Sequence, residues 1–138
     1  MRIQDIMSSK IETIGPDARL WEVAKKMRDL NIGSLAVTEK GRLLGMITDR
    51  DICCRAVAER RDPAQTPARD VMTKDVAYCF SDQDLNEAAH LMEEKHIRRL
   101  AVLDRQKQMV GFLSLDDLAH SSHDLAGEIL DVVSHTAH

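Results

Sequence analysis

Aromatic side chains are scarce in this chain, which has one Trp, one Tyr and two Phe among 138 residues. That is too few for the stacked aromatic rows on which single-stranded nucleic acids bind. A formal net charge of −4 gives no basic field that would attract a polyanion. The composition therefore argues against a nucleic-acid partner.

Long apolar runs are also missing, since no stretch approaches the ~20 residues that a membrane span needs. The N-terminus carries Asp5 and lacks the apolar core of a secretory signal. Of the three cysteines, Cys53 and Cys54 are adjacent and Cys79 lies far away, so they form no disulfide framework. We expect free, buried thiols, no membrane segment and a cytoplasmic location.

The remaining composition is that of an ordinary globular protein, with 43% hydrophobic and 30% charged residues. A chain of this length can bury roughly 68–70% of its unfolded surface, so a core can form without disulfides or metal. One compact domain, or two tightly fused half-domains, is expected.

The chain is a tandem duplication. Met7 recurs as Met72, a shift of 72 − 7 = 65, and Gly45 recurs as Gly111, a shift of 111 − 45 = 66. One extra residue in a turn of the second copy accounts for the change, as expected of a structural repeat. The shift of 65 also matches Asp5 with Asp70, Asp17 with Asp82, Leu20 with Leu85, Glu22 with Glu87, Ala24 with Ala89, Met27 with Met92, Ile32 with Ile97, and Leu35–Val37 with Leu100–Val102.

Each copy predicts the α+β order strand–helix–strand–strand–helix. Asp17, behind Pro16, is the expected cap of the first helix, and Ser81 with Asp84 approaches a capping box for its counterpart. The expected strands are 13–14, 34–37 and 43–48 in the first copy and 78–80, 99–103 and 109–114 in the second, with final helices from 49 to about 59 and from 115 onward.

The two copies predict a first domain at residues 1–62, a linker at 63–69 and a second domain at 70–122. Two prolines interrupt any helix in the linker region. A C-terminal extension at 123–138 carries a weak helical pattern over Asp124–Val133. No metal site is expected at the C-terminal histidines His120, His123, His135 and His138. These histidines have no cysteine or carboxylate partners at the spacing of a metal site.

Two stretches with the same design, Gly45–Asp51 and Gly111–Asp117, are the candidate functional elements. In each, a glycine opens an apolar strand, a hydroxyl residue follows, and a carboxylate comes three residues later at the start of a helix. Backbone N–H groups at such a start favour an anion. The same residue types can also simply cap the helix, so both readings stay open for Thr48, Asp51, Ser114 and Asp117.

With Asp5–Met7, Asp70–Met72 and His96–Leu100, these stretches resemble a CBS-domain pair, the module named after cystathionine β-synthase. The resemblance runs from about Ile6 to Leu118, and Met46–Asp51 is similar to small stand-alone bacterial members that include the hypoxic response proteins. It implies a tandem pair with pseudo-twofold symmetry and ligand clefts between the halves. It also implies a homodimer and an adenosine-containing ligand such as AMP, ADP, ATP, S-adenosylmethionine or NADH.

The resemblance further implies how residues are shared between the clefts. One cleft would hold Ser114 and Asp117, with Arg99 for a phosphate and with Thr13, Ile14 and Ala18 from the other half. The opposite cleft would hold Thr48 and Asp51 with Tyr78, Cys79 and Asp82, and Ser34 would stand in the place of Arg99. A neutral hydroxyl cannot replace a guanidinium against phosphate, so the first cleft should bind phosphorylated ligands better.

A regulatory binding module that signals to a separate protein is the function that these features favour, with no cofactor required. Asp51 and Asp117 are expected to serve ligand binding, not folding. An enzyme using Asp51 or Asp117 as a base is a weaker alternative, because no nucleophile–base or metal constellation accompanies them. A structural or dimerisation module with degenerate clefts is the other alternative, because Ala36 and Ala101 stand where many members have proline.

Overall fold

The computed structural model describes residues 1–121, which fall into two compact units. Unit 1 combines Met1–Ile11 with the chain from Ala77 onward, and unit 2 is Glu12–Val76. The predicted extension at 123–138, with its helical pattern and three of the four C-terminal histidines, lies outside the described residues.

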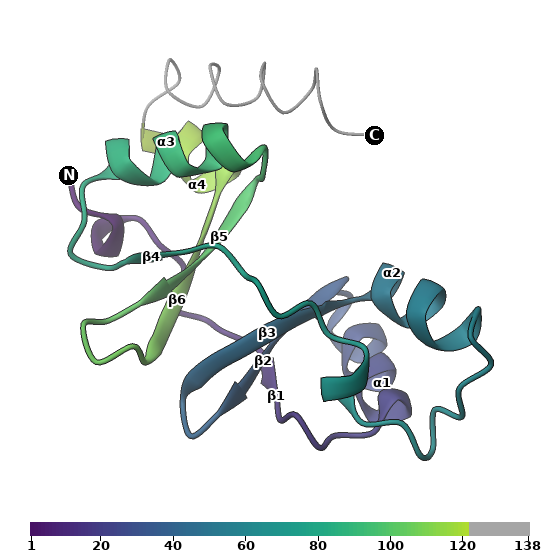
Figure 1. The fold of residues 1–138 in the computed structure, drawn as a ribbon. Coiled ribbons are helices and arrows are strands. Elements are labelled where there is room, and N and C mark those ends of the chain that lie inside the picture. The colour runs from purple at the N-terminus through teal and green to yellow at the C-terminus, as the bar shows by residue number, and fades with distance from the viewer. Residues whose placement is uncertain (122–138) are drawn as a thin grey trace. The chain divides into compact units, whose positions relative to one another are not determined.

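Unit 2 contains a three-stranded sheet in the order β1 (Thr13–Ile14), β2 (Ser34–Glu39) and β3 (Arg42–Thr48). β1 runs parallel to β2, and β3 runs antiparallel to it. The chain then forms helix α1 (Leu20–Leu30) between β1 and β2, and α2 (Asp49–Ile52) directly after β3, beside α1 (Figure 1). The buried core between helices and sheet consists of Leu20, Val23, Met27, Leu35, Val37, Ile47, Ala56, Ala68 and Val71.

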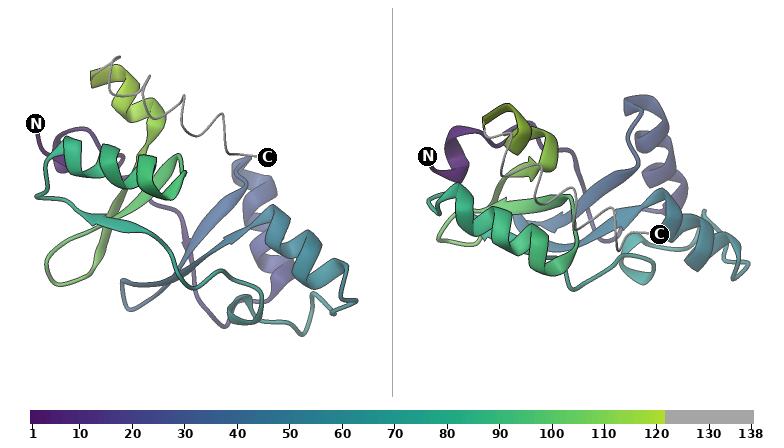
Figure 2. Two further views of the ribbon diagram at one scale, coloured as in Figure 1. Left: turned by 45° about the horizontal axis from the view of Figure 1, so that its top comes forward. Right: turned by 90° about the horizontal axis from the view of Figure 1, so that it is seen from above.

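Unit 1 repeats this arrangement with β4 (Tyr78–Phe80), β5 (Arg99–Leu103) and β6 (Met109–Ser114), again one parallel and one antiparallel pair. Helices α3 (Leu85–Lys95) and α4 (Leu115–Ser121) cover one side of the sheet (Figure 2). The predicted fold class, a tandem α+β pair, is therefore confirmed. Its core consists of Ile3, Cys79, Leu85, Ala88, Ala89, Met92, Leu100, Val102, Leu113, Leu115 and Leu118.

The segments at the start of the two sequence repeats, residues 1–11 and 66–76, are exchanged between the units. We call them the leader segments. The first leader forms the 3₁₀ helix η1 (Ile3–Asp5), where Ile3 N donates to Gln83 O at 2.9 Å. The second forms η3 (Ala68–Asp70), where Ala68 N donates to Ala18 O at 2.8 Å. Each leader thus completes the compact unit built from the body of the other repeat.

Each leader then pairs with the outer strand of the sheet it joins. Ser8 and Phe112 exchange two backbone hydrogen bonds of 2.8 and 2.9 Å, and Thr73 and Met46 exchange two of the same lengths. These bonds satisfy edge groups on β6 and β3 that would otherwise stand open to solvent or to another chain.

Gly45 and Gly111 allow this close approach. A Cβ added to Gly45 would lie 2.6 Å from Thr73 O, and one added to Gly111 would lie 2.6 Å from Ser8 O. Both obstacles are backbone atoms, which cannot rotate away. The repeated glycine is therefore required by the leader that crosses it, which gives the motif glycine a packing role.

The helix caps correct two expectations from the sequence. Helix α1 begins after Arg19, not at Asp17, and α3 is capped by Asp84, whose side chain accepts a hydrogen bond from Asn86 N. The side chain of Asp17 instead forms an ion pair with Arg69 of the leader. The acid that looked like a cap thus helps to hold the exchanged segment.

The second helix of unit 2 also differs from the expected continuous helix. α2 covers only four residues before the chain widens into the π-helical turn η2 (Cys53–Val57). Cys53 and Cys54 are exposed there, so the expectation that they are buried thiols is wrong. Only Cys79 among the three is buried.

Gly45→Ala and Gly111→Ala should each lower the free energy of unfolding by about 1–3 kcal/mol, because the new methyl group overpacks a backbone contact. Urea unfolding of the purified variants measures this. Gly15→Ala is the matched control: its Cβ meets nothing within 4 Å, so a change within about 0.5 kcal/mol is expected. Equal effects at all three glycines would contradict a packing role for Gly45 and Gly111.

Candidate functional site

In unit 2 the candidate pair Thr48 and Asp51 forms a closed capping box where β3 ends. Asp51 N donates to Thr48 Oγ1, and Thr48 N donates to Asp51 Oδ2, each at 3.0 Å. The Asp51 side chain is only 14% exposed, and its second oxygen, Oδ1, lies 3.8 Å from Arg55 Nε. One oxygen of this carboxylate therefore holds the helix start, while the other faces a guanidinium.

Unit 1 repeats the box with Ser114 and Asp117. Asp117 N donates to Ser114 Oγ at 3.1 Å, and Ser114 N donates to Asp117 Oδ2 at 2.9 Å. Both carboxylates thus make the hydrogen bonds that the capping reading requires, so the expectation that they serve binding and not folding depends on a stability measurement. Contact with a ligand through the remaining oxygen stays a prediction.

Within unit 1, Arg99 is paired with Ser114 across β5 and β6. Its phosphate-binding role stays a prediction. A hollow of about 300 Å³ opens there, lined by Arg98, Arg99, Ser114, Leu115 and Asp116. Asp117 is not among these lining residues, whereas its neighbour Asp116 is. A cation, a hydroxyl and a helix start thus share one small polar hollow.

Strand alternation would send Arg98 and Arg99 to opposite faces, yet both line this hollow, because Arg98 precedes β5. Its carbonyl accepts a 2.8 Å hydrogen bond from Leu115 N, which holds it against the start of α4. The corresponding bond in unit 2 runs from Asp49 N to Gly33 O, and Ser34 is paired with Thr48. Unit 2 therefore has Gly-Ser where unit 1 has two arginines.

The remaining predicted ligand residues lie on the strands and loops of their own units. Thr13 and Ile14 form β1, and Ala18 lies in the loop before α1, where its carbonyl binds the second leader. Tyr78 is exposed at 40%, whereas the side chain of Cys79 packs in the core of unit 1. Any pairing of residues from different units stays a prediction.

The burial of Cys79 has a chemical consequence. Desolvation raises the pKa of its thiol to about 12. Its Sγ lies 3.7 Å from Ala101 O, within its own sheet. Cys79 is thus a packing residue of β4, and its thiol offers neither a nucleophile nor a ligand contact.

An aromatic cluster on β4 was not expected from so few aromatics. The rings of Tyr78 and Phe80 meet edge to face at a centroid distance of 5.6 Å, and Arg105 lies 4.2 Å over the Phe80 ring. Arg105 also hydrogen-bonds Asp82 at 2.9 Å, which holds the pKa of that carboxyl below its usual value. The turn between β5 and β6 is thereby held against the end of β4.

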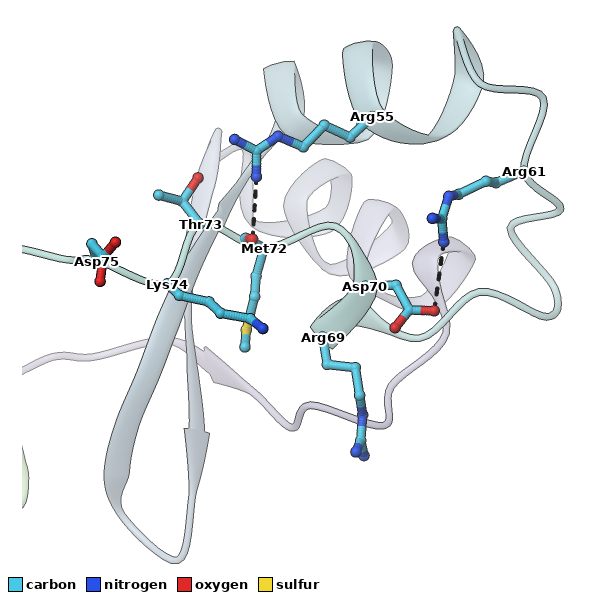
Figure 3. A pocket seen from close by; sticks show the side chains of 8 residues that line it. All are labelled: Arg55, Arg61, Arg69, Asp70, Met72, Thr73, Lys74 and Asp75. Carbon is cyan, nitrogen blue, oxygen red and sulfur yellow. Dashed lines mark hydrogen bonds and ion pairs between the residues drawn. The ribbon is translucent and has the colours of Figure 1, made fainter.

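A larger hollow, of about 560 Å³, lies in unit 2 between η2 and the second leader (Figure 3). Arg55 and Arg61 point toward the leader, where Arg61 pairs with Asp70 at 3.5 Å, while Arg69 extends away from both (Figure 3). Each arginine has a carboxylate nearby, so the positive charge here is largely offset. The hollow is lined by Arg55, Arg61, Arg69, Asp70, Met72, Thr73, Lys74 and Asp75.

The part of the chain that the structure describes, residues 1–121, holds no group of three His, Cys, Asp or Glu side chains that could bind a metal ion. None of its helices combines the length and the apolar character of a membrane-spanning helix.

The comparisons identify the family. A family model described as the CBS domain matches residues 3–56 and 68–124. The chain therefore belongs to the CBS-domain family and carries two copies of the domain, as its sequence repeat predicts.

Individual relatives agree with this assignment. The CBS domain-containing protein YhcV of Bacillus subtilis is 38% identical over 135 residues, covering 96% of this chain and 95% of YhcV. The structure of Hypoxic Response Protein I with two coordinated zinc ions matches with a TM-score of 0.78 at 29% identity, over 88% of this chain and 99% of that one. The CBS domain pair of protein MJ0100, in complex with 5′-methylthioadenosine and S-adenosyl-L-methionine, matches with a TM-score of 0.72 at 25% identity, over 88% and 94%.

The capping boxes predict that alanine and asparagine substitutions at Asp51 and Asp117 differ in their effect on the free energy of unfolding. Asp51→Ala and Asp117→Ala should each cost about 1 kcal/mol of unfolding free energy, because the strand–helix junction loses its acceptor. Asp51→Asn and Asp117→Asn retain a side-chain oxygen and should change stability by less than about 0.5 kcal/mol. Urea unfolding at neutral pH measures all four variants, and equal stability of the Ala and Asn variants would rule out the capping role.

Proposed function

We propose that this chain is a regulatory CBS pair that binds an adenosine-containing ligand and signals its presence to a separate protein in the cytoplasm. The ligand classes are AMP, ADP or ATP, S-adenosylmethionine, and NADH. The observation that carries the proposal is the hydroxyl–carboxylate pair, which occurs at the same strand–helix junction in both units. The adenosine-type ligands bound by the CBS pair of MJ0100 support the ligand class.

The chemistry of the two boxes suits a ribose. Asp51 and Asp117 each commit one oxygen to a backbone N–H, and an ionised carboxylate retains further acceptor capacity on its second oxygen for ribose hydroxyls. The hydroxyls of Thr48 and Ser114 accept a backbone hydrogen bond and keep their own proton to donate. Recognition of a sugar thus requires no rearrangement of either cap.

We propose that the ligand acts as a regulatory signal and not as a substrate. The Cys79 thiol is buried and its pKa is raised, so it is a poor nucleophile. Binding without turnover is the behaviour that these groups support, and no cofactor is required for it.

We further propose a homodimer. In unit 2, Trp21 is 52% exposed and Val57 is 68% exposed, although both are large apolar residues. A second copy of the chain would cover such surface. Light scattering at micromolar protein should give a dimeric mass, and a monomeric mass would contradict the proposal.

The ligand test is a thermal-shift screen with AMP, ADP, ATP, NADH and S-adenosylmethionine. A ligand that binds the folded protein stabilises it by about 2.7 kcal/mol at a hundredfold excess over Kd. Asp51→Asn and Asp117→Asn should fold normally and lose part of that shift, because the charge-assisted acceptor for the ribose is gone. If none of the five compounds raises the melting temperature, the structural or dimerisation alternative replaces this proposal.

The two sites should differ in their affinity for phosphate. Arg99 and Arg98 line the hollow beside Ser114, whereas Ser34 and Gly33 occupy these positions in unit 2. Charge-assisted hydrogen bonds contribute about 1.5–3 kcal/mol, which corresponds to roughly ten- to a hundredfold in affinity. In calorimetry, Arg99→Ala should weaken the tighter phase for ATP by that factor and leave adenosine binding nearly unchanged.

The control for this measurement is Asp51→Asn, which lies in the unit without the arginine pair. It should weaken the looser phase only. If Asp51→Asn removes the tighter phase instead, the sites are assigned in the wrong order.

A further inference from the structure

Arg55 binds the second leader through its guanidinium. Its Nη1 donates to Val71 O and to Met72 O, each at 3.2 Å. Figure 3 shows the bond to Met72. The Sδ of Met72 would lie 3.0 Å from a Cβ added to Gly45, and the next residue, Thr73, pairs with Met46 of β3. The guanidinium thus holds the leader where it crosses the sheet edge.

The same side chain faces the candidate ligand residue Asp51. Arg55 Nε lies 3.8 Å from Asp51 Oδ1, one helical turn earlier. Oδ2 of this carboxylate already accepts from Thr48 N, so Oδ1 is the oxygen that a ligand would engage. The Arg55 guanidinium therefore contacts both Asp51 Oδ1 and the backbone carbonyls of the leader.

Unit 1 has no such connection within the described residues. The position equivalent to Arg55 is Ser121, at 55 + 66 = 121, and its hydroxyl donates only to carbonyls of its own helix, Asp117 O at 3.4 Å and Leu118 O at 3.1 Å. The first leader, at Ser8, therefore pairs with β6 without a side-chain clamp from α4. The duplication provides a matched internal control.

Arg55 also has room to move. The hollow of about 560 Å³ opens beside it, between η2 and the leader. Half of the Arg55 side chain is exposed. A change in the attraction from Asp51 can therefore shift the guanidinium without a clash with the core.

We propose that Arg55 is a positioning residue that couples the state of Asp51 to the second leader, and that among residues 1–121 this coupling exists in unit 2 only. When Asp51 Oδ1 is neutralised or engaged, the guanidinium loses the charge that orients it, and its grip on Val71 and Met72 weakens. The leader is followed along the chain by β4, which begins at Tyr78. The statement about ligands rests on the proposed function, whereas the coupling between Arg55 and Asp51 does not.

The coupling is tested without any ligand by amide hydrogen exchange of the full chain, resolved by NMR at Thr73 and Ser8. Arg55→Met keeps an unbranched stem but removes the donors, and it should speed exchange at Thr73 about tenfold, which equals about 1.4 kcal/mol. Asp51→Asn keeps the cap acceptor but removes the charge, and it should speed exchange at Thr73 about threefold. In the double variant, Asp51→Asn should add nothing to the effect of Arg55→Met.

The amide of Ser8 reports the equivalent leader in unit 1 and should keep its rate in all three variants. Asp117→Asn is the matched substitution, and it should change neither amide, because Ser121 cannot transmit the loss of charge. The proposal is overturned if Asp51→Asn acts equally with and without Arg55, or if Arg55→Met leaves exchange at Thr73 unchanged.

ATP supplies the second arm. Saturating ATP should speed exchange at Thr73 relative to Ser8 in the natural sequence but not in Arg55→Met. If thermal shift shows that ATP and the other four compounds do not bind, the proposed function fails. The exchange rates of the Arg55→Met, Asp51→Asn and double variants still test the coupling between Arg55 and Asp51, because they need no ligand. If ATP binds and exchange at Thr73 is unchanged, transmission of the ligand signal through Arg55 is disproved.

Discussion

The contact of a leader backbone with a glycine is the constraint on which the rest of this fold depends. At Gly45 and Gly111 the neighbouring carbonyl lies so near that no side chain fits between them. With the leader in place, the outer strand of each sheet gains a partner, and the apolar side chains of η1 and η3 enter the cores, where Ile3 and Ala68 are fully buried. Without it, each sheet would keep an open edge and lose part of its core.

Each capping box uses one carboxylate oxygen to hold the helix start and leaves the other oxygen available for a second role. A carboxylate has two oxygens, and the box uses only one of them, so the second can face a guanidinium or a ligand without loss of the cap. The cost of such dual use is that alanine substitutions confuse the two roles. Asparagine separates them, because it keeps the acceptor and removes the charge.

Periodicity and internal repetition predicted the strands, the helix order and the positions of Thr48, Asp51, Ser114 and Asp117 well, because these depend on local sequence. The exchange of leaders was out of reach, since Met7 and Met72 pack in the same way whichever repeat they join. Strand alternation predicted that at most one of Arg98 and Arg99 would face a given cleft, but both line the hollow beside Ser114, because Arg98 lies just before β5 and does not follow the alternation of the strand. The exposure of Cys53 and Cys54 follows from a π-helical turn, which widens the helix and has no clear sequence signature.

The leader exchange also bears on how such a molecule could arise. In this chain each sheet edge is filled by the leader of the other repeat and not by its own. Two identical one-repeat chains that kept this arrangement would exchange leaders, which makes a pair of chains the smallest assembly in which both edges are filled. Joining the two copies in one chain makes the exchange of leaders intramolecular, so each leader is present at a high effective concentration near the sheet edge that it fills. Once they are joined, the two halves can diverge, as Arg55 and Ser121 have, without losing their partner.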